Sequence, residues 1–119
     1  MQHESLILYS KIEALFFQVY PTFKNYPKAE KHALCQHIKE TFVSLLECVA
    51  TAKEVPSMRK KATQEAAARL QNLVTLYRLS RHERYISKGF FEQIDLKITE
   101  IKKILVGFMK SAGKPRHEP

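Results

Sequence analysis

The segment "ISKGFFEQIDLKITEIKKILVGFMKS", residues 86–111, decides the fold class because its apolar residues recur at intervals of three and four positions. This is the period of one face of an α-helix. Ser87 precedes the pattern as a helix N-cap, and Ile86 and Phe91 have the spacing of a hydrophobic staple. The segment therefore predicts a long amphipathic helix with one buried face. That face comprises Phe90, Ile94, Ile98, Ile101, Leu105 and Phe108.

Three earlier segments have the same period. In the first, Pro21 should kink the helix or end it near Tyr20, because proline lacks a backbone donor. The second should begin with Pro27 in its first turn and stop before Pro56. The third should span residues 57–82. The predicted inward faces are Leu8, Ile12, Leu15, Phe16, Val19 and Phe23 in the first, Leu34, Ile38, Phe42, Leu45, Val49 and Ala52 in the second, and Ala66, Leu70, Leu73, Val74 and Tyr77 in the third.

Short connections between long amphipathic helices favour antiparallel neighbours. We therefore expect an all-α fold, an up-down-up-down antiparallel four-helix bundle formed by residues 1–112. Gly113 and Pro115 should end the last helix and leave residues 113–119 as a flexible C-terminal tail. The chain has only 3 glycines and 5 prolines, which argues against a loop-rich β-fold.

The hexapeptide "HALCQH", residues 32–37, raises the possibility of a metal site. On a helix, His32 and Cys35 lie on neighbouring faces, whereas His37 points away from both. Because no second Cys/His cluster could complete a site, we expect neither a metal nor a cofactor. Cys35 and Cys48 lie in apolar helical patterns and are expected to be reduced. The N-terminus resembles a first helix and not a signal peptide, so the cytoplasm is the expected location, with no membrane partner.

Catalytic motifs are also missing from the sequence. There is no glycine-rich phosphate loop, nucleophile elbow or set of Glu-x-x-His pairs. Single carboxylates such as Glu13, Glu47 and Asp95 are more often solvated than catalytic. We therefore do not expect an enzyme.

Positive charge is the most informative property of the sequence. The chain has 20 Lys and Arg against 12 Asp and Glu, a formal net charge of +8. Residues 57–85 hold seven cations and only two acidic residues, Glu65 and Glu83. Three of the cations begin a helix, where the macrodipole favours anions. This corner predicts phosphate binding and thus nucleic acid as a partner, with solubility alone as the alternative reason for three basic residues near a turn. The candidate contacts are Arg59, Lys60, Lys61, Arg69, Arg78, Arg81 and Arg84.

Aromatic residues available for stacking on bases are few. Most Phe and Tyr fall on inward faces, and only Phe17, Tyr26 and Tyr85 are expected to be exposed. The expected binding mode is therefore contact with the phosphate backbone and little sequence readout.

A second apolar stripe lies away from the predicted core. Val43, Leu46 and Ala50 form it on the second helix, and Leu76 and Leu79 form it on the third. A monomeric bundle does not need such residues, so they are candidates for a subunit interface, although scattered surface apolar residues are common.

Three phrases of the sequence carry a resemblance to a known family. They are "YPKAEKHALCQHIKETFVSLLECVATAKE", "QEAAARLQNLVTLYRLSRHERYIS" and "FEQIDLKITEIKKILVGFMKS". Together they resemble the accessory variability determinant, Avd, of diversity-generating retroelements. Related four-helix proteins from ribosomal RNA intervening sequences share the opening matched by "YPKAEKHAL". Those proteins usually end this helix with an Ile-Ala-Glu-Gly phrase, whereas "ATAKEV" stands here and favours Avd.

The resemblance implies a homopentameric barrel of four-helix bundles with a basic surface. That assembly would bind nucleic acid, both RNA and DNA, and the reverse transcriptase of the retroelement, and would support mutagenic copying of a template RNA into cDNA. The resemblance places the nucleic-acid contacts on the seven basic residues given above. Two alternatives stay open: an intervening-sequence bundle without a retroelement role, and a scaffold that binds only proteins.

Overall fold

The computed structural model describes residues 2–113, with side chains from Glu4 to Ser111. Four α-helices and three short 3₁₀-helices make up the described chain, and it contains no strand. The α-helices are α1 (Gln2–Val19), α2 (Leu34–Glu54), α3 (Arg59–His82) and α4 (Lys88–Gly113), and the 3₁₀-helices are η1 (Tyr20–Asn25), η2 (Lys28–Glu30) and η3 (Pro56–Met58).

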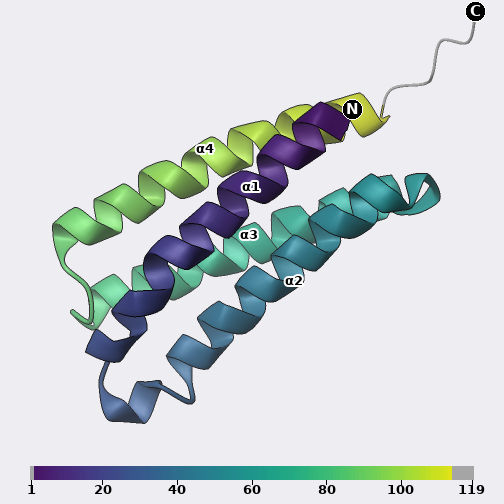
Figure 1. Cartoon of the computed structure of the whole chain (residues 1–119). Coiled ribbons are helices and arrows are strands. Elements are labelled where there is room, and N and C mark those ends of the chain that lie inside the picture. Colours follow the sequence, from purple (N-terminus) through teal and green to yellow (C-terminus); the bar gives the residue numbers. More distant parts are fainter. Residues whose placement is uncertain (1, 114–119) are drawn as a thin grey trace, which may run out of the picture.

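The four α-helices run alternately up and down, and each packs beside its neighbours in the sequence (Figure 1). Contacts between α1 and α4 close the ring. The predicted antiparallel bundle is therefore confirmed for the single chain. None of the described helices combines the length and apolar character that a membrane span requires.

The core consists almost entirely of the predicted inward faces. Ile12, Phe42, Leu73 and Ile94 lie at its centre and are at most 1% exposed. Burying each such side chain contributes about 1.5–3 kcal/mol before the entropy of ordering it is counted. Three predicted core residues are only partly buried and pack at its margin: Phe16, Val74 and Phe90.

Two predicted helix ends are confirmed. α1 ends at Val19, and Pro21 lies in the first turn of the following 3₁₀-helix η1. α4 begins with a capped turn, in which the Phe90 amide donates a hydrogen bond to Ser87 Oγ at 3.1 Å. Gly113 is the last residue of α4, so it does not belong to the predicted tail, and residues 114–119 lie outside the described part of the chain.

The predicted start of the second helix is wrong. Pro27 precedes the 3₁₀-helix η2, and the α-helix begins only at Leu34. The cause is Tyr26, which was expected on the surface but is 3% exposed. Its hydroxyl donates to Ser80 Oγ of α3 at 2.8 Å, and Tyr85 donates to Glu30 Oε2 at 2.9 Å. These contacts hold the connection against the end of α3, so the chain turns before it becomes helical.

The end of α3 contains a left-handed residue. Arg84 has φ of 61°, a conformation that glycine adopts without steric cost. The amide of Arg84 donates to the carbonyl of Arg81, and that of Tyr85 donates to the carbonyl of Ser80. This is the hydrogen-bond pattern of a Schellman motif, in which the left-handed position is usually glycine.

The first prediction concerns this strained position. Arg84→Gly should stabilise the fold by about 1 kcal/mol, because glycine removes the contact between Cβ and the backbone. Arg84→Ala is the matched control, since it also loses the guanidinium but keeps Cβ. Urea unfolding measures the free energy of unfolding of both variants. Equal values for Arg84→Gly and Arg84→Ala would show that the left-handed conformation does not strain residue 84.

A second prediction concerns Tyr26. Burial raises the pKa of its hydroxyl from 10.0 to about 12. Tyr26→Phe should cost about 1 kcal/mol at neutral pH, because it removes the hydrogen bond to Ser80. Ser80 keeps its own bond to the Leu76 carbonyl, so its hydroxyl retains a partner.

The pH dependence has a definite sign. Since the folded-state pKa is the higher one, the wild type should lose stability as the pH rises from 10 towards 12, where the unfolded chain ionises more readily. The phenylalanine variant lacks this loss. The difference in melting temperature between the wild type and Tyr26→Phe should therefore decrease from pH 7 to pH 11. A constant difference would show that the Tyr26 hydroxyl does not cause the pH dependence.

Candidate nucleic-acid interface

The seven predicted basic contacts do not form one face. Lys60 and Arg78 are 18 residues apart on α3, five full turns, so they point the same way but lie about 27 Å apart. Lys61 points about 100° away from Lys60. Four of the seven side chains are exposed, and three are partly buried. The exposed ones are Lys60, Lys61, Arg78 and Arg84, and the partly buried ones are Arg59, Arg69 and Arg81.

Arg59 is held by the end of α2. Its Nε donates to the Ala52 carbonyl at 2.7 Å, and its Nη2 lies 3.4 Å from the Lys53 carbonyl. These carbonyls form the negative end of the α2 dipole, where a cation is favourable. The sequence suggested that the cations at the start of α3 need an external anion. For Arg59 that reasoning fails, because the partner lies within the chain.

Arg69 also has a partner within the bundle. Its Nε donates to Ser44 Oγ of α2 at 3.0 Å, which fixes the guanidinium beside the seam between α2 and α3. Arg59 and Arg69 therefore link α2 to α3. The α3 cations that remain available to an external partner are chiefly the exposed Lys60, Lys61 and Arg78.

Arg78 lies at a groove between α3 and α4 of about 230 Å³. The floor of this groove is apolar, formed by residues such as Val74 and Leu105, and Lys102 adds a second cation at its wall. Asp95 also lines the groove. This arrangement can hold an apolar group beside an anion, although the carboxylate reduces its positive potential.

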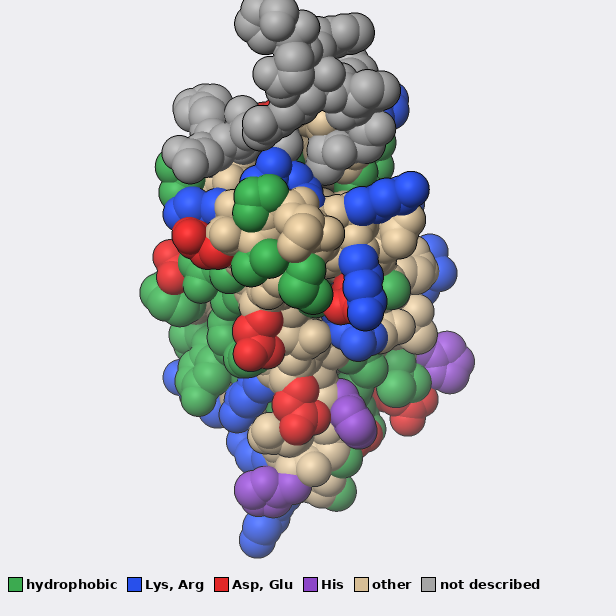
Figure 2. Space-filling model, turned by 90° about the vertical axis from the view of Figure 1, so that its right-hand side faces the viewer, with side chains coloured by type: hydrophobic (Ala, Val, Ile, Leu, Met, Phe, Trp, Pro, Cys, Tyr) green, Lys and Arg blue, Asp and Glu red, His purple; other side chains and the backbone are tan. Residues whose placement is uncertain are grey.

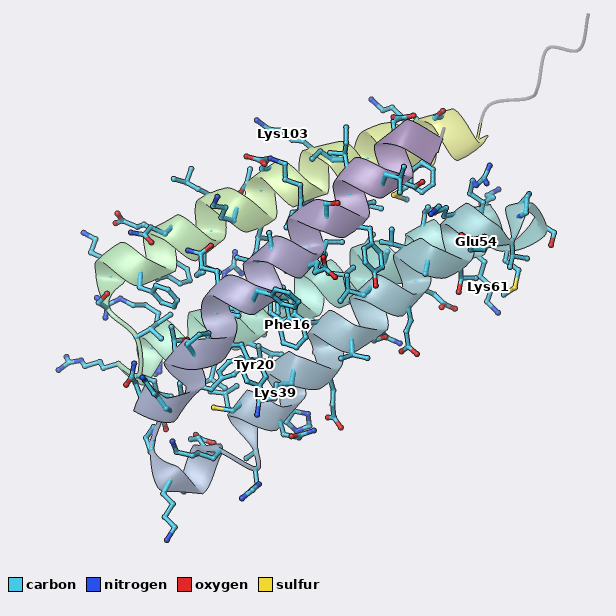
Figure 3. All side chains as sticks on the ribbon, viewed as in Figure 1. Phe16, Tyr20, Lys39, Glu54, Lys61 and Lys103 are labelled. Atoms are coloured by element: carbon cyan, nitrogen blue, oxygen red, sulfur yellow. The ribbon has the colours of Figure 1, made fainter. Side chains whose placement is uncertain are left out.

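Sequence reasoning missed a second basic cluster, at the corner where α1 leads through η1 to α2. Lys24, Lys31 and Lys39 line one pocket there together with Tyr20 and Phe23. Figure 3 shows Phe16, Tyr20 and Lys39 beside one another between α1 and α2. These lysines come from the connection and from α2, so a count of charge along a single helix does not reveal them.

The end of the bundle where α2 meets α3 has a mixed surface. Figure 2 shows Lys and Arg side chains at several separate places over this end, with hydrophobic side chains gathered along the left margin of the view. Val55 and Met58 are 38% and 43% exposed at this connection. The basic charge on this side is therefore dispersed and not concentrated into one field.

The predicted interface residues lie on α2 and α3 and differ in exposure. Val43 and Leu79 are exposed, whereas Leu46 and Leu76 are partly buried against the core. Ala50 borders a small pocket together with Leu6 and Tyr9 of α1. Leu76 follows Arg69 by seven residues and so faces α2.

α1 and the first residue of η1 have an exposed apolar surface, of which only Phe17 was expected from the sequence. Leu6 is 50%, Phe17 68% and Tyr20 53% exposed. On α4, Leu96 is 71% exposed. The residues predicted for stacking differ from one another, since Phe17 is exposed as expected, Tyr85 is only partly exposed, and Tyr26 is buried.

The His/Cys hexapeptide does not converge. His32 lies in the turn before α2, Cys35 is buried with its Sγ 3.9 Å from the Phe23 carbonyl, and His37 lies at the surface near Glu40. Burial raises the pKa of the Cys35 thiol, with Lys39 and Lys31 acting against it. Cys48 is likewise a free thiol with a raised pKa. Among the described residues, no three His, Cys, Asp or Glu side chains are grouped to hold a metal.

Comparison with known proteins identifies the family. A family model described as bAvd-like matches residues 6–112, which is nearly the whole bundle. No curated protein and no solved structure matches the chain. The chain therefore belongs to the bAvd-like family, in agreement with the resemblance of its sequence to the accessory variability determinants of diversity-generating retroelements.

Proposed function

We propose that this protein is a non-catalytic accessory subunit of a diversity-generating retroelement, acting in the cytoplasm. It binds nucleic acid with low sequence specificity, associates with the reverse transcriptase and the template RNA of the element, and supports mutagenic cDNA synthesis. The observation that carries the proposal is the family match over residues 6–112. An accessory role in a retroelement follows from the family in general terms, and the binding activities are our extension.

Unpaired positive charge supports nucleic-acid binding. Among the Lys and Arg residues of the described part of the chain, only Lys11 and Lys53 form ion pairs with carboxylates, to Glu100 and Glu54 respectively. Most of the excess of cations is therefore available to external phosphates. Binding of this kind releases counterions and is strongly salt-dependent.

Assembly would multiply this charge. Five copies of a chain with net charge +8 would carry a formal charge near +40, enough to attract nucleic acid from a distance. The homopentamer is a proposal taken from the family resemblance, and the exposed Val43 and Leu79 are its candidate contacts.

A non-catalytic role is supported by the position of the two buried tyrosines whose pKa values are shifted. Burial raises the pKa of Tyr26 and of Tyr77, and both side chains pack within the core. These shifts follow from burial in the bundle and do not indicate a substrate site.

The alternatives are a four-helix protein of a ribosomal RNA intervening sequence and a scaffold that binds only proteins. A reverse-transcriptase gene beside the gene for this protein would favour the proposed function over the intervening-sequence alternative. Co-purification of the tagged protein with that reverse transcriptase and its template RNA tests the proposal directly. Salt-sensitive binding of RNA or DNA by the purified protein would argue against the second alternative.

A third prediction tests the basic residues of α3. Changing Lys60 and Lys61 together to Glu should lower affinity for RNA and DNA oligonucleotides roughly tenfold at low salt and flatten the salt dependence. Stability should be retained, because neither lysine forms an ion pair in the described chain and acidic residues suit a helix start. Fluorescence anisotropy at two salt concentrations measures both effects.

The matched control reverses Lys103 and Lys110 of α4, which are exposed and lie outside the predicted site. It changes the net charge by the same amount. If both double variants lose affinity equally, net charge alone governs binding, and the start of α3 is not the site.

A fourth prediction tests assembly. Val43→Glu and Leu79→Glu should each give a smaller particle by light scattering, because the new carboxylates would meet within an apolar contact. Leu96→Glu is the control, since Leu96 is 71% exposed and belongs to no predicted interface. An unchanged particle in both test variants would remove these residues from the interface.

A further inference from the structure

Two adjoining pockets lie at the corner between α1 and α2. The lysine pocket, of about 300 Å³, is lined by Lys24, Lys31 and Lys39 and also by Cys35 and Phe23. The aromatic pocket, of about 340 Å³, is lined by Phe16 and Phe17. Tyr20 and Pro21 line both pockets, so a ligand that fills one is in reach of the other.

The lysine pocket can receive an anion. None of its three lysines forms an ion pair with a carboxylate within the described chain. Two of them are held in place, since Lys31 Nζ donates to the Lys24 carbonyl at 2.8 Å and Lys39 Nζ lies 5.0 Å from the centre of the Tyr20 ring. The nearby Glu30 accepts a hydrogen bond from Tyr85, which satisfies one of its oxygens without a lysine.

The aromatic pocket offers a rigid apolar surface. Phe17 and Tyr20 are 68% and 53% exposed, which is unusual for rings of this size beside one another. The Tyr20 ring is oriented by edge contacts with Phe16 and Phe23, each with ring centres 5.9 Å apart. Such a ring can stack on a flat ligand without losing much side-chain entropy on binding.

We propose that this corner binds single-stranded nucleic acid, with a base against Tyr20 and Phe17 and the adjoining phosphates among Lys24, Lys31 and Lys39. The inference rests on the proposed function and deepens it, because it names the form of nucleic acid that is bound. An aromatic ring beside a basic groove recognises unpaired bases, whose faces are free to stack. In a duplex those faces are covered, so a duplex can use only the lysines.

Anisotropy with matched probes tests the proposal. The probes are a single-stranded DNA oligonucleotide of about twelve nucleotides, within the range of known single-strand sites, the same strand without bases, and the corresponding duplex. The wild type should bind the intact strand about five- to a hundredfold more tightly than the abasic strand, as expected for one stacked base. Both strands carry the same phosphates, so the ratio isolates the bases.

Two substitutions at Tyr20 separate the ring from the rest of the site. Tyr20→Leu should remove most of the preference for the intact strand and leave duplex binding unchanged, whereas Tyr20→Phe should retain the preference. Phe17→Ala should weaken it in the same way, and its exposed position makes loss of folding a poor explanation. Circular dichroism confirms the helical content of each variant.

The outcomes distinguish this proposal from the proposed function. Equal binding of intact and abasic strands by the wild type would overturn the stacking site and leave charge-driven binding in place. Failure of the wild type to bind any of the probes would overturn both. A smaller particle for Phe17→Ala by light scattering would assign this surface to contact with a second copy of the chain, and would also overturn the stacking site.

Discussion

The buried side chain of Tyr26 links the connection between α1 and α2 to the end of α3, and the form of that end of the bundle depends on it. Its hydroxyl bonds to Ser80, and its ring contacts those of Phe23 and Tyr85. Phe23 in turn contacts Tyr20 at the surface. A continuous series of rings therefore runs from the core to the corner pockets. Through these contacts the packed interior fixes the orientation of the exposed Tyr20 ring.

The basic residues divide by what holds them. Arg59 and Arg69 join α2 to α3 through a helix end and a serine hydroxyl, so their charges stabilise the bundle. Lys24, Lys31 and Lys39 converge at a corner although they are spread over the sequence. A helix that is rich in cations is thus not the same as a basic surface. The location of positive potential depends on which cations find partners inside the chain.

The helix faces could be predicted from the sequence because they depend on periodicity alone. The core around Ile12, Phe42 and Ile94 follows from apolar spacing, and the start of α4 follows from Ser87. The late start of α2 could not be predicted, since it depends on a contact of Tyr26 with a residue 54 positions away. The same limit applies to the candidate site: residue types predicted positive charge, but the partner of Arg59 and the corner pockets depend on how the connections fold.

The ring of contacts in which every helix packs beside its sequence neighbours has a consequence for folding kinetics. The α2–α3 and α3–α4 hairpins each close only a short connection, so the entropy lost on closing them is small. Only the contact between α1 and α4 joins the two ends of the chain. A chain with this order of contacts reaches its native topology rapidly, as helical proteins with mostly local contacts do. In the proposed assembly, folding of each chain can therefore be complete before subunits meet, so that their association, which depends on concentration, becomes the slower step.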